Sequence, residues 1–339
     1  MLIDIKPIST LAISVREDII AAVLSWLGRD YMPMLIEFWG FGFRPEDPKL
    51  PGKLGNRVDL DKGNLVKPLE MFYGIKLETR AEQRDTELLA IIEAELHKNH
   101  PVILNMQTMY LPYHRTYQKP EESHPHQILV TGMDESKIYW IDPACSKNVE
   151  SIALEEFTPG MISAETFVIT DQKAEDWDWR QVVRAIVQKV RTPKNGHKDI
   201  FEAIRDFANK IETSLDITVE TDGCEFDMES LRFNQFIFKI DQLSRSRNTI
   251  AKVFDYLAEK NDFPALRTIA ESFRLIAQEW VRLRYIIIKG VTTPSDETSI
   301  MRAVEKIKKL ADKEEEMAVI LERWCDNDTE FYHSSVDLG

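Results

Sequence analysis

The feature that most constrains this chain is a change in sequence pattern close to residue 171. Before it, short apolar runs alternate with Pro, Gly and Asn, whereas after Asp176 apolar residues recur at helical spacing with few helix breakers. The acidic stretch that starts at Asp171 separates the two patterns. Because single hydrophobic cores stop growing near roughly 250–300 residues, a chain of 339 residues is long enough for two domains. We therefore expect one domain at residues 1–172 and another at residues 176–330.

The second expected domain has the pattern of a helical bundle. Its clearest apolar stripe follows three- and four-residue spacing and contains Phe273, Ile276, Trp280, Leu283 and Ile287. Such a stripe lies on one face of a helix and is normally buried against other helices. We therefore predict an all-α helical bundle. The alternative use of the stripe is a groove that binds a partner.

The first expected domain combines helices with short strands. Residues 14–27 show helical spacing, Ser14 and Glu17 match the Ser-x-x-Glu capping box, and Gly28 follows as a stop signal. A second helix is expected at residues 81–98. Strands are expected at residues 101–108, 126–133, 137–141 and 166–170. A turn of hairpin length separates the middle two strands, so we predict an α+β fold with a small antiparallel sheet.

The charge balance argues against several classes of partner. Lys and Arg number 43 against 57 Asp and Glu, which gives a formal net charge of -14. Binding to nucleic acid or to an anionic membrane relies on clustered positive charge, so we expect neither. The first residues lack the basic-then-apolar pattern of a signal peptide, and an odd count of 3 cysteines indicates a reducing compartment. We expect a cytoplasmic protein without a membrane span.

Candidate chemistry lies at His126 and Asp142. His126 starts one strand of the predicted hairpin and Asp142 follows the end of its partner, which brings a carboxylate within reach of the imidazole. An Asp in this position fixes the tautomer of the His and stabilises its charged form. Ser14 would complete a Ser–His–Asp arrangement. The alternatives are that Ser14 only caps its helix, that His126 is a hydrogen-bonded structural residue, and that Asp142 only forms a turn before Pro143.

Four segments, in this order, carry a resemblance to a known family. Residues 126–134 read His-Gln-Ile-Leu-Val-Thr-Gly-Met-Asp, and they follow residues 14–28, 101–104 and 110–113. Together with the Asp-Pro pair at residues 142–143, this layout resembles the N-terminal domain of the butirosin biosynthesis protein H family, over about residues 8–170. The resemblance implies a papain-like fold, to which bacteriocin-processing cysteine peptidases are more distantly related, followed by a helical C-terminal part.

The resemblance also implies an activity. The named member of the family transfers an acyl group from an acyl carrier protein to an amine of an aminoglycoside. In such an enzyme a Cys attacks the carrier thioester, a His acts as base and then acid, and an Asp orients the His. Here Val15 occupies the position expected for the Cys, and Ser9 the position expected for a Gln that would bind the oxyanion.

Two hypotheses therefore stay open. The first is an acyltransferase or thioesterase of nonribosomal peptide or similar secondary metabolism, in which Ser14 is the nucleophile or His126 serves as base for direct attack by an amine. The second is a catalytically inactive homologue that binds as an accessory protein in a biosynthetic assembly. A peptidase is a third and weaker hypothesis, because this fold needs a thiolate for proteolysis.

Further candidates concern substrate and metal binding. The candidates for substrate binding are Val15, Trp39, Phe41, Gln107, Tyr110 and Tyr113. For the aromatic run at residues 37–43 the alternative is a core wall against the first helix, and for the tyrosines a surface loop. His114, His124, His126 and Cys145 match no strong zinc spacing, so we expect no metal and no cofactor. Cys145 is either a reactive or an inert thiol. The expected partners are a carrier protein and a small-molecule amine.

Overall fold

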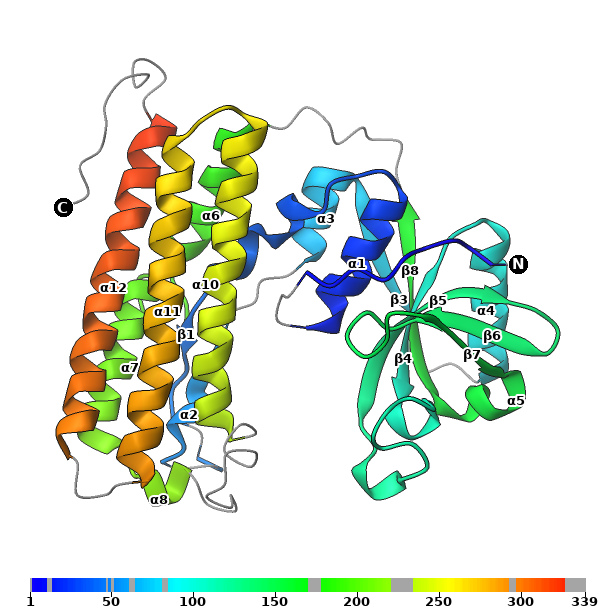
Figure 1. Cartoon of the computed structure of the whole chain (residues 1–339), viewed down its shortest axis with the longest axis horizontal. Helices are drawn as coiled ribbons and strands as arrows, with labels where there is room; N and C mark the ends of the chain where they lie inside the picture. The colour runs from blue at the N-terminus through cyan, green and yellow to red at the C-terminus, as the bar shows by residue number, and fades with distance from the viewer. Residues whose placement is uncertain are drawn as a thin grey trace. The chain divides into compact units, whose positions relative to one another are not determined.

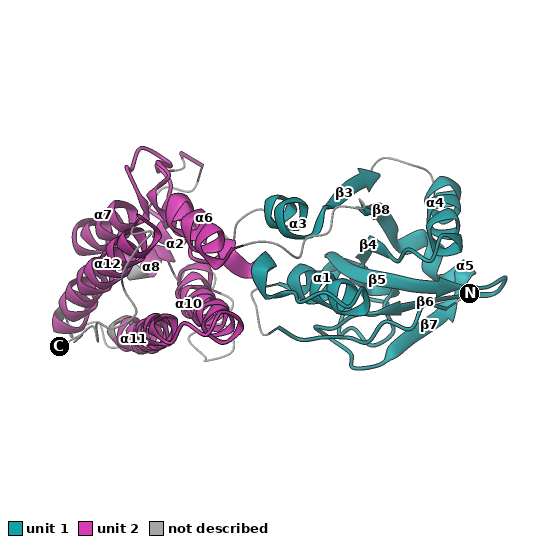
Figure 2. Ribbon diagram, turned by 90° about the horizontal axis from the view of Figure 1, so that it is seen from above, with its two compact units in different colours: residues 1–34, 64–175 teal, residues 35–63, 176–339 magenta. Residues whose placement is uncertain are grey.

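The chain forms two compact units in the computed structural model. Unit 1 contains Met1–Met34 and Asn64–Glu175, and unit 2 contains Leu35–Gly63 and Asp176–Gly339 (Figure 2). Residues 35–63 thus belong to unit 2, although the sequence analysis assigned them to the first domain. The structure describes residues 2–10, 14–46, 48–49, 52–60, 65–80, 85–169, 178–220, 234–292 and 297–326.

Unit 1 is built on a 6-stranded sheet with the order β3-β8-β4-β5-β6-β7, in which every pairing is antiparallel. Its strands are β3 Ile75–Arg80, β4 Val102–Gln107, β5 Pro125–Met133, β6 Lys137–Ile141, β7 Val149–Ala153 and β8 Met161–Ile169. The sheet confirms the predicted α+β class. The sequence analysis missed the edge strands β3 and β7, because these strands are largely exposed and lack an apolar run.

The hairpin of β5 and β6 is fixed by its turn. The Asp134 carboxylate accepts hydrogen bonds from the backbone N–H groups of Ser136 and Lys137, at 2.8 and 2.9 Å. These bonds set where β6 starts, and the ladder then pairs Leu129 with Ile141. As a result, the first residues of β5 lie near the residues that follow β6.

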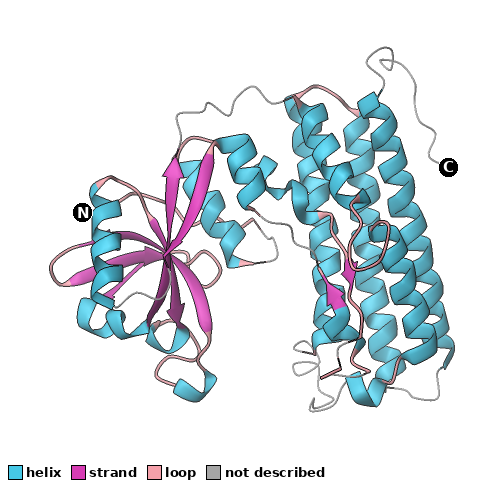
Figure 3. Cartoon of the chain, turned by 180° about the vertical axis from the view of Figure 1, so that it is seen from behind, coloured by secondary structure: helices cyan, strands magenta, loops and turns pink. Residues whose placement is uncertain are grey.

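Helices cover both faces of the sheet. Figure 1 and Figure 3 show α1 and α4 on opposite sides of it. The helices of unit 1 are α1 Val15–Trp26, α3 Val66–Tyr73, α4 Asp85–His97 and α5 Leu154–Phe157, and the short 3-10 segments are η2 Thr108–Tyr110, η3 Pro120–Glu122 and η4 Thr158–Gly160. The predicted start of the second helix at Ala81 and the predicted end of the last strand at Thr170 lie outside the described residues.

Unit 2 is a bundle of long helices that run side by side (Figure 1). They are α6 Trp179–Arg191, α7 Ile200–Ser214, α10 Gln235–Lys260, α11 Ala265–Thr292 and α12 Glu297–Asp326, with the short helices α2 Leu54–Arg57 and α8 Ile217–Glu220. The predicted stripe of α11 is buried throughout, which confirms the all-α C-terminal region. None of the described helices combines the length and the apolar character that crossing a membrane requires.

The segment at residues 35–63 is part of the core of unit 2. It contains the 3-10 segment η1 Met32–Phe38, most of which lies in this unit, and the paired strands β1 Gly42–Phe43 and β2 Val58–Asp59. The Trp39 ring lies 4.7 Å from that of Phe273, and the Phe41 ring lies 5.8 Å from that of Phe207. This placement corrects the expectation that Trp39 and Phe41 belong to the first domain, as a cleft lining or as a wall against its first helix.

A buried ion pair holds this segment in the bundle. Arg247 and Glu314 are both fully buried, at 0% side-chain exposure, and their charged groups lie 2.7 Å apart. Glu314 also accepts a hydrogen bond from Trp39 Nε1 at 2.8 Å, and Arg247 donates to the carbonyl oxygen of Gly40 at 2.8 Å. A buried ion pair persists only when both charges are paired and hydrogen-bonded. Residues 35–63 supply two of the hydrogen bonds that this ion pair needs, and these bonds connect the segment to α10 and α12.

Candidate functional site

The structure brings His126 and Asp142 together at one end of the sheet of unit 1. His126 is the second residue of β5, and Asp142 directly follows β6. His126 Nε2 lies 2.8 Å from Asp142 Oδ2, with side-chain exposures of 15% and 0%. The carboxylate is therefore shielded from water while one part of the imidazole reaches the surface. Because Nε2 faces the carboxylate, Nδ1 is the ring nitrogen left for chemistry.

Other groups hold the carboxylate in place. The Tyr113 hydroxyl donates to Asp142 Oδ2 at 2.8 Å and accepts from Trp140 Nε1 at 3.2 Å. The backbone N–H of Ala144 donates to Asp142 Oδ1 at 3.3 Å. Burial alone would raise the pKa of Asp142, but the bonds from His126 and Tyr113 keep that pKa below its usual value. Tyr113 was expected to contact substrate, which stays a prediction, and in the structure it supports Asp142.

The protonation state of His126 follows from its surroundings. Burial on its own would lower the pKa of the imidazole, but the hydrogen bond to Asp142 and the neighbouring Cys145 raise that pKa to about 9. His126 is therefore an imidazolium at neutral pH, paired with an ionised Asp142. In this form the ring is an acid and a hydrogen-bond donor, not a base.

Cys145 is the third member of this cluster. One ligand atom each of His126, Asp142 and Cys145 lies within 4.8 Å of the others. The Cys145 side chain is exposed. These residue types also bind zinc. In this geometry, however, the closest atoms of His126 and Asp142 are already bonded to each other, and Asp142 Oδ2 is also bonded to Tyr113. The sequence analysis left Cys145 open, because only the fold shows its distance from His126.

His114 lies beside His126, and His124 lies beside His114. The His114 ring centroid lies 5.8 Å from that of His126 and 5.3 Å from that of His124. Burial lowers the pKa of His114, and the charges of His126 and His124 lower it further. The surroundings thus favour the charged form of His126 and the neutral form of His114 at neutral pH.

The start of α1 lies on the other face of the sheet. Side chains of successive strand residues point to opposite faces, so Gln127 points away from the face of His126. Gln127 Nε2 lies 3.4 Å from Glu165 Oε1, and Arg16 at the start of α1 binds Glu165 with two bonds of 2.7 and 2.8 Å. The helix therefore begins over the face that carries Gln127. These contacts lie on the face opposite His126, and the expected meeting of the α1 start with the His126 ring stays a prediction.

Ser14 and Val15 stand at the start of α1. The Glu17 carboxylate accepts hydrogen bonds from the Ser14 hydroxyl and from the Ser14 N–H, each at 2.6 Å. Ser14 thus belongs to a capping box, which was the alternative to a catalytic role. Val15, the next residue, is half-buried. The triad of Ser14 with His126 and Asp142 stays a prediction, because the Ser14 hydroxyl is bonded to Glu17 in this structure.

The other candidates for substrate binding are distributed over the molecule. Gln107 accepts a hydrogen bond from Ser123 at 3.0 Å, at the start of the loop that leads to β5. Tyr110 packs against Gly160, where an added Cβ would lie 2.7 Å from the tyrosine ring. Both residues are half-buried on segments next to the His126 end of the sheet. Trp39 and Phe41 are buried in the core of unit 2.

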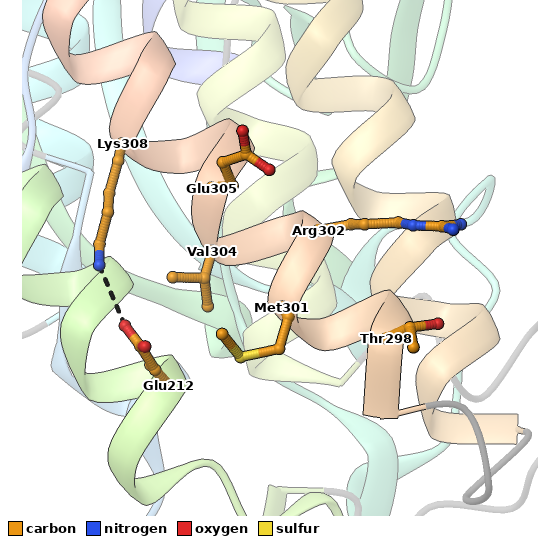
Figure 4. Close-up of a pocket in the computed structure, with 7 residues that line it drawn as sticks. All are labelled: Glu212, Thr298, Met301, Arg302, Val304, Glu305 and Lys308. Carbon is orange, nitrogen blue, oxygen red and sulfur yellow. Dashed lines mark hydrogen bonds and ion pairs between the residues drawn. The ribbon is translucent and has the colours of Figure 1, made fainter.

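Unit 2 contains an open hollow of its own. Figure 4 shows its lining from α7 and α12, which consists of Glu212, Thr298, Met301, Arg302, Val304, Glu305 and Lys308. Lys308 and Glu212 form an ion pair of 3.0 Å across it. The residues that line this hollow include neither His nor Cys, so it does not collect the acid–base and nucleophilic groups found around His126.

Comparison with known proteins gives a family match for the N-terminal part of the chain. No curated protein matches the sequence. One family match starts after Ser14 and Val15 and includes both His126 and Asp142. Residues 20–143 match the family described as butirosin biosynthesis protein H, N-terminal, and this match confirms the resemblance that the sequence analysis found for the first domain.

Proposed function

We propose that this protein transfers an acyl group from a carrier-protein thioester to an amine in secondary-metabolite biosynthesis, and that His126 and Asp142 perform the chemistry. The observation that carries this proposal is the 2.8 Å bond between a partly accessible imidazole and a fully buried carboxylate, inside the segment that matches the family. We infer that the protein works in the cytoplasm on a small-molecule amine.

The protonated state of His126 defines its part in the reaction. When an amine replaces the carrier thiol on the acyl carbon, the departing sulfur needs a proton and the carbonyl oxygen needs a hydrogen-bond donor. An imidazolium supplies either. Asp142 keeps the ring charged and in one orientation, and Tyr113 and Trp140 keep Asp142 in place.

The second candidate function is a binding protein without catalysis. It is favoured by Val15 at the helix start and by Arg16, the next residue, whose side chain is committed to an ion pair with Glu165. A protein of this kind would bind the acylated carrier protein in a biosynthetic assembly and leave the thioester intact.

A transfer assay separates the two functions. The full chain is incubated with an acyl-loaded carrier protein and a set of primary amines that includes an aminoglycoside, and amide products are measured by mass spectrometry. We expect His126→Ala to slow amide formation by about 10²–10⁴-fold, the usual contribution of a positioned acid or base. His97→Ala is the matched control, because His97 is 69% exposed on α4.

Each result favours one function. Amide formation that depends on His126 and not on His97 supports transfer. Binding of the carrier protein without any amide product supports the accessory role. Amide formation that continues unchanged in His126→Ala removes His126 from the mechanism.

A further inference from the structure

We propose that Cys145 is the nucleophile of the transfer and carries the acyl group before the amine receives it. This inference rests on the proposed function and names the residue that performs its covalent step. It moves the nucleophile from the start of α1, where Val15 stands, to the turn that follows β6.

The turn after β6 places the thiol and the carboxylate together. The backbone N–H groups of Cys145 and Ser146 donate to the carbonyl oxygen of Asp142, at 3.1 and 2.8 Å. This turn holds Cys145 three residues after Asp142, and the same Asp142 is bonded to His126. One local structure therefore fixes all three groups, whose ligand atoms lie within 4.8 Å of one another. A preorganised group of this kind is what nucleophilic catalysis requires.

Accessibility separates Cys145 from the other described cysteine. Cys145 is exposed, so a thioester on the arm of a large carrier protein can reach it. Cys325 is buried at 4% exposure in unit 2, where burial raises the pKa of its thiol to about 11. Cys224 lies outside the described residues. Among the described cysteines, Cys145 alone combines access with a neighbouring imidazole.

The charge of His126 favours a covalent route over direct attack by the amine. An imidazolium cannot accept the proton of an attacking amine, but it stabilises a neighbouring thiolate by Coulomb attraction. It can then give its proton to the first leaving group. After that step the ring is neutral and able to act as a base when the amine arrives.

The proton and bond changes balance over two steps. In the first, the Cys145 thiolate attacks the thioester carbon, a new carbon–sulfur bond forms, the bond to the carrier sulfur breaks, and His126 protonates the departing sulfur. In the second, the amine nitrogen attacks the acyl-Cys145 carbon and passes a proton to His126. The carbon–sulfur bond to Cys145 then breaks and releases the thiolate. The net products are an amide and the carrier thiol.

A metal site made of the same three residues fits the geometry less well. A metal ion bound through His126 Nε2 and Asp142 Oδ2 would take the place of the proton between these two atoms, which lie 2.8 Å apart, and Asp142 Oδ2 also accepts from Tyr113. Coordination would separate this pair and remove the contact that keeps His126 charged. The covalent role uses the cluster as it stands.

Thiol labelling tests the inference without a known substrate. The full chain is treated with iodoacetamide at neutral pH, and labelling of each cysteine is followed by peptide mass spectrometry. We expect Cys145 to react at least about ten-fold faster in the wild type than in His126→Gln, because the imidazolium no longer stabilises the thiolate. Cys325 is an internal control: its labelling rises only if the variant unfolds. Equal rates at Cys145 in two folded proteins would overturn the inference.

An acyl-transfer experiment with cysteine variants provides the second test. The N-acetylcysteamine thioester of acetic acid is the probe, and the wild type is expected to gain one acetyl group at Cys145 that is absent in Cys145→Ala. Cys325→Ala is the matched control and should retain the adduct. One equivalent of zinc in the purified protein, lost on Cys145→Ala, would also overturn the inference, because the thiol would then be a ligand.

The outcomes distinguish this inference from the proposed function. If Cys145→Ala still forms amide from acyl-loaded carrier at the wild-type rate, the nucleophile is wrong and the proposed function stands. If the wild type gains the acetyl adduct but transfers it to no amine, the nucleophile is supported and the acceptor is wrong. If the wild type shows neither adduct nor amide, both are wrong.

Discussion

Raising the pH should remove a stabilising charge from the His126–Asp142 pair, and the structure gives the size of the effect. The pKa of His126 is about 9 in the folded protein, against an ordinary value of 6.5. At about 1.4 kcal/mol per pH unit, this difference corresponds to about 3 kcal/mol of unfolding free energy. Only 15% of the His126 side chain is exposed, so solvent screening takes away little of it.

The sign follows from the direction of the pKa change. The folded protein binds the proton more tightly than the unfolded chain does, so the stabilisation is complete below pH 6.5 and is lost as the pH rises through about 9. Asp142 does not titrate in this window, because its pKa lies below 3.8. His114 does not add a similar loss of stability at high pH, because its pKa in the folded protein is lowered, not raised.

Two measurements check this prediction. Urea unfolding of the wild type and of His126→Gln between pH 6 and 10 should give curves that differ by about 3 kcal/mol at the acidic end and converge at the alkaline end. Taking the difference between the unfolding free energies of the two proteins removes the contribution of lysine and tyrosine titrations, which both proteins share. NMR of the His126 ring should show a midpoint near 9. Parallel stability curves together with a midpoint near 6.5 would refute the reasoning.

Three further predictions concern the two units. Glu314→Gln should cost about 3–5 kcal/mol of unfolding free energy, because it leaves a buried guanidinium without its counter-charge; Glu212→Gln, which breaks a surface pair, should cost under about 1 kcal/mol in the same urea experiment. Val15→Cys in a protein without other reactive thiols should be alkylated at a rate that His126→Gln leaves unchanged, and a slower rate in the double variant would show that the two positions meet. Ser14→Ala should lower stability by about 1 kcal/mol through loss of the capping box and leave amide formation unchanged, as judged by parallel unfolding and transfer assays.

Local signals made part of the site predictable from the sequence. A turn of hairpin length defines the antiparallel pair β5 and β6, and that pair brings the start of one strand near the end of the other. His126 and Asp142 meet for this reason, and the capping box at Ser14 and Glu17 forms from residues three positions apart. Each of these contacts depends on geometry within a short stretch of chain, so the sequence specifies it.

The face of the sheet could not be predicted in the same way. Whether His126 or Gln127 points toward α1 depends on strand register, and a shift of one residue exchanges the two faces. The pairing of Asn105 with both Gln127 and Ser163 fixes that register through contacts that are distant in sequence. A single sequence shows only that apolar and polar residues are present in β5, so it does not specify which of the two residues faces α1.

The unit to which the aromatic residues 37–43 belong could not be predicted from the sequence either. Residues 37–43 are apolar enough for any core, and their position in the chain favoured the first domain. The deciding contacts are those of Trp39 with Glu314 and of Gly40 with Arg247, which join residues more than two hundred positions apart. No local sequence pattern predicts that the buried carboxylate of Glu314 accepts a hydrogen bond from the indole N–H of Trp39.

The central claim is that the chemistry of unit 1 gathers around His126 on the face away from α1, and a nuclear Overhauser measurement tests it most directly. The protein is selectively protonated at the His rings, the Cys β positions and the Val methyl groups. The His126 ring should then give cross-peaks to the β protons of Cys145 and none to the methyl groups of Val15. Cross-peaks from His126 to Val15, with none to Cys145, would contradict the account.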